Sequence, residues 1–316
     1  MFGLKAKDAS GEDGIRLAVG FFDGVHLGHQ RILAGANAVL TFRNHPASVL
    51  GVAGRPALLM EADERLALLA TEGAKNPRTV HAITFTHRFA ALSAEQFADF
   101  LRREFPNLVR IHCGGNWRFG ANGAGTPAML RALGFDVKVC RYAKYREERV
   151  SSTRIRAALA SGEIADANAM LGRPYAVTGL IVSGKGLGHK IGSPTLNLTV
   201  SPPLKLGVYV VDTPLGCGIA NYGVAPTMGI QAWAAPVLEV HLLDGRALAG
   251  ASRPMSLRVA FRAFLRPEMA FASRSALSER IAADIAAARR FFGLSLEQML
   301  AHGDGDGLNA VGYSEF

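Results

Sequence analysis

The chain has 316 residues, of which 49% are hydrophobic and only 19% are charged, so it is long enough to bury the cores of about two domains. It has no run of about 18 apolar residues, which excludes a membrane-spanning helix, and its first residues lack the apolar stretch of a secretion signal. The three cysteines are odd in number and far apart, which fits neither a disulfide framework nor a paired zinc motif. We therefore expect a cytoplasmic protein with reduced cysteines.

The net charge of +9 and the pI near 9.8 suit a protein whose partners carry phosphate. Nucleic acid is one such partner, but the lysines and arginines are scattered and no motif that reads DNA or RNA is present. Phosphate-bearing small molecules are therefore the expected partners, with nucleic acid a weaker alternative, and the oligomeric state is left open.

In the first half of the chain, short β-rich runs alternate with helical patterns. Strands are predicted at 15–22, 38–42, 80–85 and 108–113, and helices at 61–73 and 93–105. The second helix opens with Ser93 ahead of Glu95 and Gln96, a sequence typical of a helix cap. Alternating strands and helices predict a parallel sheet with right-handed crossovers.

After Pro174 the pattern changes to strand after strand, punctuated by glycine and proline. The predicted strands are 176–184, 204–212, 217–224, 236–244 and 256–265. This spacing favours an antiparallel barrel, followed by a helix at about 274–292. We expect two domains, 14–172 and 173–294, and a glycine-rich tail at 295–316 that is poorly ordered and lacks the ligand pattern of a calcium loop.

The segment GFFDGVHLGHQ (20–30) follows the first strand directly and leads into a helix through two glycines. In an open parallel sheet, ligands bind beyond the carboxyl ends of the strands, where helix N-termini attract phosphate. His26 and His29 are three residues apart, so both rings can face one way and bind phosphate oxygens. A helix-capping histidine or half of a metal site is the alternative.

The segment SSTRIRAALASG (151–162) places three hydroxyl residues at a helix start and Arg156 in the first turns. This composition suits the outer phosphates of ATP. Taken alone, it fits an ordinary helix cap with a solvated arginine equally well.

A second candidate site lies at VSGKGLGHKIGSPTLNL (182–198), a glycine-rich loop followed by Thr195 and Asn197. The loop N–H groups can cradle phosphate, and the two side-chain oxygens suit Mg²⁺, although the glycines could also make a hairpin turn. In the strand at 236–244, alternation puts Glu239 and His241 on one face. By itself, that face is more often the solvent side of a barrel than a catalytic one.

In order and spacing, GFFDGVHLGHQ, TFRNHP (41–46), GGNWRFGANGAGT (114–126) and SSTRIR (151–156) resemble one half of a known family, the bacterial bifunctional riboflavin kinase/FMN adenylyltransferases, or FAD synthetases. The later segments LGRPYAVTGLIVSGKGLGHKIGSPTLNL, GVYVV, PVLEVHLLDG and FLRPEM resemble the other half. The resemblance implies a Rossmann-like nucleotidyltransferase domain, then an antiparallel riboflavin kinase barrel with a C-terminal helix. It implies that riboflavin and ATP give FMN, and that FMN and ATP give FAD and pyrophosphate.

For the first domain, the resemblance implies that His26 and His29 contact the α-phosphate of ATP and that Asn116 orients the reacting phosphates. Ser152, Thr153 and Arg156 would hold the β- and γ-phosphates. The remaining nucleotide-binding residues implied are Gly20, Phe22, Asp23, Gly24 and Gly28. Among them Asp23 has an equally good explanation as a turn residue.

For the second domain, the resemblance implies that Glu239 is the general base for the terminal ribityl hydroxyl, with Thr195 and Asn197 holding Mg²⁺ and phosphate. Arg266 would shape the flavin pocket, with a surface salt bridge as the alternative. The phosphate loop would use Gly184, Gly186 and Gly188.

The chain departs from the family in both halves. Only RILAGAN separates Gln30 from the strand at 38–42, so the crossover is short; the turn is expected to survive and the FMN-facing wall to be altered. In the kinase half, His189 and Ala225 stand where arginine is usual, and Ser193 where phenylalanine is usual. The absence of these two arginines predicts that phosphate or flavin is bound more weakly. A single retained activity, or a flavin-binding regulator without activity, is the alternative function.

Overall fold

The computed structural model describes residues 14–51, 56–182, 195–223, 236–243 and 256–293. The chain divides into two compact units. Unit 1 comprises residues up to 158 together with 166–173, and unit 2 comprises 159–165 together with the residues from 174 onwards. The domain limits of 14–172 and 173–294 stay predictions, and the short segment 159–165 falls with unit 2.

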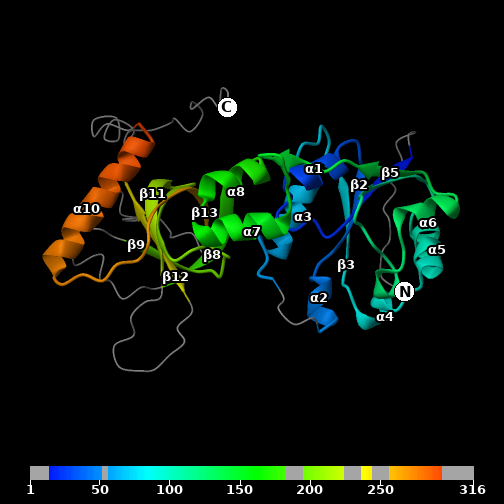
Figure 1. Cartoon of the computed structure of the whole chain (residues 1–316), viewed down its shortest axis with the longest axis horizontal. Coiled ribbons are helices and arrows are strands. Elements are labelled where there is room, and N and C mark those ends of the chain that lie inside the picture. Colours follow the sequence, from blue (N-terminus) through cyan, green and yellow to red (C-terminus); the bar gives the residue numbers. More distant parts are fainter. Residues whose placement is uncertain (1–13, 52–55, 183–194, 224–235, 244–255, 294–316) are drawn as a thin grey trace. The chain divides into compact units, whose positions relative to one another are not determined.

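Unit 1 contains a five-stranded parallel sheet in the order β3-β2-β1-β4-β5. Figure 1 labels β2, β3 and β5 of this sheet. Its strands are β1 (Ile15–Val19), β2 (Ala38–Phe42), β3 (Thr79–Ile83), β4 (Leu108–Gly114) and β5 (Val137–Cys140). The prediction of a parallel sheet is confirmed. Strand β5 was not predicted from the sequence, because this edge strand has only four residues and includes an exposed lysine.

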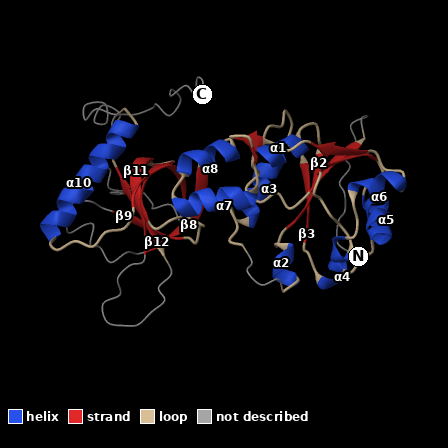
Figure 2. Cartoon of the chain, viewed as in Figure 1, coloured by secondary structure: helices blue, strands red, loops and turns tan. Residues whose placement is uncertain are grey.

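Eight helices belong wholly or partly to the described residues of unit 1, and Figure 2 distinguishes them from the strands. They are α1 (Leu27–Leu33), α2 (Pro46–Val49), α3 (Ala62–Thr71), α4 (His87–Ala90), α5 (Ala94–Glu104), α6 (Pro127–Ala132), α7 (Ser152–Ser161) and α8 (Ile164–Leu171). A short hairpin, β6 (Lys144–Tyr145) and β7 (Glu148–Arg149), precedes α7. At the start of α5, Ser93 and Gln96 bond to each other's backbone N–H groups, as the capping sequence predicted.

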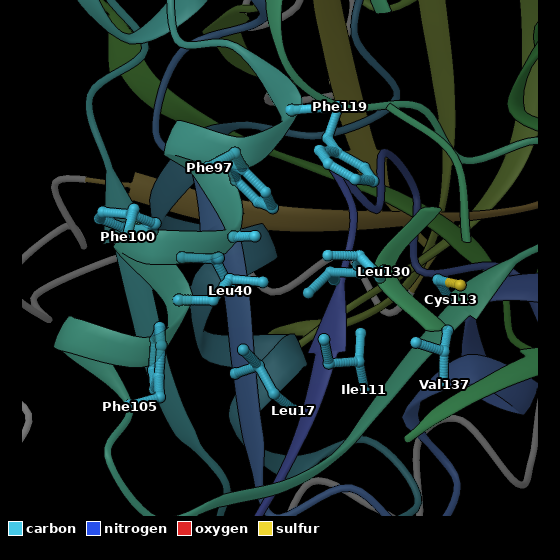
Figure 3. Packing of buried hydrophobic residues seen from close by; sticks show 14 of the residues in the cluster. Leu17, Leu40, Phe97, Phe100, Phe105, Ile111, Cys113, Phe119, Leu130 and Val137 are labelled. Atoms are coloured by element: carbon cyan, nitrogen blue, oxygen red, sulfur yellow. The ribbon is translucent and has the colours of Figure 1, made fainter. Parts of the chain in front are cut away.

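Successive residues of β1 point to opposite faces of the sheet, and both faces are buried. Leu17 packs in a cluster with Phe97 and Phe100 of α5 (Figure 3), whereas the next residue, Ala18, packs in a cluster with Leu33 of α1. A central strand buried on both faces explains why the run at 15–19 is almost continuously apolar.

The short crossover between β1 and β2 closes as the sequence analysis expected. Helix α1 begins at Leu27, inside the GFFDGVHLGHQ motif, and ends at Leu33. The two strands that it connects pair in parallel, with Leu17 opposite Ala38. The motif therefore supplies the first turn of the crossover helix, and the turn before it is preserved.

Unit 2 contains a closed barrel in the order β10-β11-β12-β9-β8-β13. Its strands are β8 (Tyr175–Val182), β9 (Thr195–Thr199), β10 (Gly207–Thr213), β11 (Gly216–Gly223), β12 (Val237–Leu242) and β13 (Ser256–Arg266), all paired antiparallel. The predicted barrel is confirmed, and β9 is the strand that the sequence analysis did not separate from the glycine-rich loop. Helix α10 (Arg274–Phe291) buries Ala288 against the barrel, on the predicted face.

Candidate functional site

The turn between β1 and α1 has an unusual backbone. Phe22, Gly24 and Val25 have φ values of 61°, 81° and 41°, in the left-handed region that costs non-glycine residues about 1–3 kcal/mol each. Surrounding groups hold it there: Arg173 donates to the carbonyls of Gly24 (2.7 Å) and Val25 (3.1 Å), and Gln30 also donates to Val25 (3.1 Å). At Gly24 the φ of 81° and a Cβ position 2.6 Å from Cδ1 of Leu59 both favour glycine. The turn is thus fixed before any ligand binds.

His26 caps α1, and its ring lies against that of His29. The Nδ1 atom of His26 accepts the backbone N–H groups of Gly28 (3.1 Å) and His29 (3.3 Å). The two rings are stacked, with centroids 3.6 Å apart and planes at 17°. Gly28 allows this packing, because a Cβ there would lie 3.0 Å from Cε1 of His26. The helix-capping role left open by the sequence is real, and it orients the ring.

Both histidines are neutral at pH 7. Burial lowers the pKa of His26 to about 4 and the pKa of His29 well below its ordinary value, and Arg149 and Arg173 add to both effects. Because Nδ1 of neutral His26 accepts hydrogen bonds, its proton is on Nε2. Nδ1 of His29 is buried and has no hydrogen-bond partner among the described residues. The pair therefore offers neutral N–H donors for a phosphate group.

A cavity of about 430 Å³ lies beside these rings, a size typical of sites for small ligands. Residues from both predicted nucleotide-binding segments line it. Seven of the predicted residues do so: His26, Gly28, His29, Asn116, Ser152, Thr153 and Arg156. Gly20, Phe22, Asp23 and Gly24 belong to the β1–α1 segment but do not line the cavity.

Asp23 connects the turn to α7. Its Oδ2 atom lies 2.8 Å from Nη1 of Arg156, and its Oδ1 atom accepts the backbone N–H of Leu59 at 2.9 Å. The hydroxyl of Ser152 donates to the carbonyl of Asp23 at 2.9 Å. Burial raises the pKa of Asp23, while the Leu59 N–H and the cations of Arg156 and Arg65 act in the opposite direction. Asp23 therefore orients Arg156 at the edge of the cavity.

Three further arginines line the cavity and were missed by the sequence analysis: Arg118, Arg141 and Arg149. Arg149 donates to Oδ1 of Asn116 at 3.0 Å and lies over the ring of Tyr142 at 3.8 Å. Arg118 and Arg149 lie in or beside recognised motifs, so proximity in sequence could have suggested them, whereas Arg141 follows the unpredicted strand β5. With Arg156, the described lining has four arginines and no carboxylate, which suits a polyphosphate.

A second candidate site lies on one face of β9, β11 and β12 in unit 2. Glu239 pairs in register with Asn197 on one side and with Asn221 on the other, and His241 pairs with Thr195. Leu238 and Val240 alternate with these residues and are fully buried in the barrel. The predicted side chains of Thr195, Asn197 and Glu239 therefore share one face, and Asn221 joins them without having been predicted.

Partial removal of water from around the carboxyl raises the pKa of Glu239, although the residue is exposed at the surface of the barrel. The neighbouring donors are a hydroxyl, an amide oxygen and a carboxylate, which are hard oxygen ligands that fit Mg²⁺. Among the described residues there is no cluster of three or more His, Cys, Asp or Glu that could hold a metal ion. A cation bound at this face would therefore be coordinated by the hydroxyl, amide and carboxylate oxygens of Thr195, Asn197 and Glu239.

Arg266 is buried rather than exposed. It donates from Nη2 and Nε to Oδ2 of Asp284 at 2.7 and 2.9 Å, and the two side chains are only 10% and 4% exposed. The pair fastens the end of β13 to α10, so the expected alternative of a surface salt bridge is replaced by a buried one. Its contribution to a flavin pocket stays a prediction. Several other predicted positions lie outside the described residues: Gly184, Gly186, Gly188, His189, Ser193 and Ala225.

Comparison with known proteins assigns a family to each half of the chain. A family model for FAD synthetase matches residues 9–154, and one for riboflavin kinase matches residues 171–292. The bifunctional riboflavin kinase/FMN adenylyltransferase of Escherichia coli K12 is 35% identical over 308 residues, covering 90% of this chain and 95% of that protein. The chain belongs to this family. The Pseudomonas fluorescens and Bacillus subtilis members are 35% and 30% identical, over 86% and 87% of the chain and 91% and 92% of their own lengths.

A crystal structure described as a macrolide-efflux protein from Streptococcus pneumoniae is similar in fold, with a TM-score of 0.71 and 25% identity. The similarity covers 88% of this chain and 95% of that one. No helix in the described part of this chain is long and apolar enough to cross a membrane.

Proposed function

We propose that this member of the family phosphorylates riboflavin to FMN in unit 2 and converts FMN to FAD in unit 1, using ATP in both steps. The observation that carries the proposal is the neutral, stacked pair of His26 and His29 beside a cavity with four arginines. Membership of the bifunctional family supports both activities.

In the adenylyl transfer, a phosphate oxygen of FMN attacks the α-phosphorus of ATP. A new P–O bond forms, the bond from the α-phosphorus to the bridging oxygen breaks, and pyrophosphate leaves. Phosphoryl chemistry of this kind depends on positioning and on stabilising the developing charge. His26 would donate from Nε2 to the α-phosphate, because Nδ1 is occupied by two backbone N–H groups. His29 lies in stacking contact and would bind the same group.

The outer phosphates would lie at the start of α7, beside Ser152, Thr153 and Arg156. Asp23 acts through Arg156, since its carboxylate holds the guanidinium and does not line the cavity. Asn116 would orient the reacting phosphates, and Arg149 donates to its amide oxygen, which leaves the amide N–H₂ as the donor.

In the kinase step, the terminal ribityl hydroxyl of riboflavin attacks the γ-phosphorus of ATP, and ADP leaves. Glu239 would accept the hydroxyl proton, and its raised pKa makes the carboxylate a stronger base. Thr195 and Asn197 would hold Mg²⁺, which neutralises phosphate charge when bound. The cytoplasm is the compartment predicted from the sequence for both reactions.

The decisive experiment incubates the purified full chain with MgATP and a pyrophosphatase, starting from riboflavin or from FMN, and separates the flavins over time. FAD from both starting points is the expected result. His29→Ala should abolish FAD formation and spare FMN formation, and Glu239→Ala should abolish FMN formation and spare the conversion of FMN to FAD. Equal damage to both steps by each substitution would contradict the two-site assignment.

A further inference from the structure

Arg65 of α3 is a fully buried arginine outside the cavity lining. Its Nη1 atom donates to the carbonyl of Phe21 (2.8 Å) and to the hydroxyl of Thr41 (3.1 Å). Its Nη2 atom donates to the carbonyls of Phe42 (2.8 Å) and Arg43 (3.1 Å). The guanidinium also lies over the ring of Phe21, 4.2 Å from its centroid.

This buried cation has no salt bridge with a carboxylate among the described residues. Burial lowers the pKa of Arg65, and Asp23 is the acidic group whose charge opposes that effect. Removing a guanidinium from water is costly unless its N–H groups are satisfied. Four acceptors bind its two terminal nitrogens, whereas its Nε atom is buried and has no hydrogen-bond partner among the described residues. All four acceptors come from two segments, and both segments leave the carboxyl ends of adjacent strands.

The first segment, after β1, contains Phe21 and continues into the turn that presents His26. The second segment, from the end of β2, is TFRNHP, and it continues to His45. The ring of His45 packs edge-on against Phe21 at 4.6 Å, and its Nδ1 atom caps α2 through the N–H of Ala47. Arg65 therefore joins the two segments, because one planar guanidinium binds both, and the hydrogen bond from the Thr41 hydroxyl to the Phe21 carbonyl (3.2 Å) adds a direct link between them.

We propose that Arg65 is a positioning residue for adenylyl transfer, which places the phosphate-binding turn relative to the TFRNHP segment without touching substrate. The inference rests on the proposed FMN adenylyltransferase function. A lysine has one point charge in place of a planar fork and cannot reproduce four hydrogen bonds in this geometry. Lysine at position 65 should therefore let the phosphate-binding turn shift slightly relative to the TFRNHP segment. This shift should reduce the rate of the chemical step more than the affinity for ATP.

Arg78 provides a matched control. It is also buried in unit 1 and also donates to backbone carbonyls, those of Leu69 (3.2 Å) and Glu72 (2.8 Å), but these lie near the C-terminal end of α3. R65K and R78K should therefore cost similar stability in urea unfolding. Only R65K should reduce kcat for FAD formation from FMN, by about tenfold or more, with the KM for ATP changed less than about threefold.

Riboflavin phosphorylation by the same chains checks that unit 2 is intact. A second test uses R65A and R78A with millimolar guanidinium chloride, and equal sodium chloride as the salt control. Guanidinium should restore part of the FAD-forming rate to R65A and none to R78A. If R65A does not fold, T41V provides a milder test. It removes one acceptor of Arg65 and also the hydrogen bond from the Thr41 hydroxyl to the Phe21 carbonyl (3.2 Å), which joins the same two segments, and it should lower kcat by about threefold.

Equal kcat values for R65K and R78K, or no recovery of folded R65A with guanidinium, would overturn the inference. A wild-type chain that forms no FAD would instead refute the proposed function.

Discussion

Replacing Gly28 with alanine tests whether the His26 ring must occupy its observed position. The new Cβ would lie 3.0 Å from Cε1 and 3.1 Å from Nδ1 of His26, so the ring must move by a few tenths of an ångström. The backbone of Gly28 is not in the left-handed region, so alanine introduces no conformational strain there.

The stability change should be small, because two contributions oppose each other. Alanine in place of glycine stabilises a helix by up to about 1 kcal/mol, and weakening the cap at His26 costs about 1 kcal/mol. The free energy of unfolding should therefore change by less than about 1 kcal/mol. Adenylyl transfer should slow by about 10- to 100-fold, because a histidine that is displaced from its phosphate contact stabilises the transition state poorly.

The assay measures kcat for FAD formation from FMN in wild type, G28A, H26A and the double variant, with riboflavin phosphorylation as the internal control. If Gly28 acts through the His26 ring, the double variant should be no slower than H26A. A G28A chain with wild-type kcat, or a double variant slowed by the product of the two single effects, would refute the reasoning.

Three further predictions concern pH, the barrel and the metal. Burial holds the pKa of His26 near 4, below its ordinary value of about 6.5, so the unfolded chain binds more protons between these values and stability should fall as pH decreases from about 6.5 to 4. H26N keeps a capping side chain but cannot titrate, so urea unfolding across this range should show a fall smaller by up to about 3 kcal/mol, and an unchanged fall would contradict the assignment. R266M should destabilise unit 2 by up to about 3–5 kcal/mol in urea unfolding, because it removes the bidentate partner of the buried Asp284 and leaves that carboxylate only Arg280, at 3.2 Å. D284N is the matched variant, and R266M combined with D284N should cost less than the sum of the two single changes. N197A should raise the Mg²⁺ concentration that gives half-maximal FMN formation by about tenfold or more and leave FAD formation from FMN unchanged; an unchanged Mg²⁺ requirement would remove Asn197 from the proposed ligands.

The sequence alone was sufficient for the architecture, because local patterns decide it. Apolar runs separated by amphipathic helices specify a parallel sheet, and the capping sequence at Ser93 forms the capping box that it predicts. The alternation of Glu239 and His241 with buried leucine and valine follows from the two-residue period of a strand. Strands β5 and β9 were not predicted from the sequence, because short strands with polar residues show only a weak hydrophobic pattern.

The site needed the tertiary structure wherever its residues are far apart in the chain. His26 and His29 are neighbours in one helical turn, so their spacing in the sequence already suggested a common role. The ion pair of Asp23 with Arg156 spans 133 positions, and the bonds from Arg65 reach back to Phe21 and Thr41. No local pattern contains such partners, because they meet only when crossovers bring the ends of parallel strands to one edge. The residue types were therefore readable from the sequence, whereas burial, which makes both histidines neutral and gives Arg65 its four acceptors, was decided by the fold.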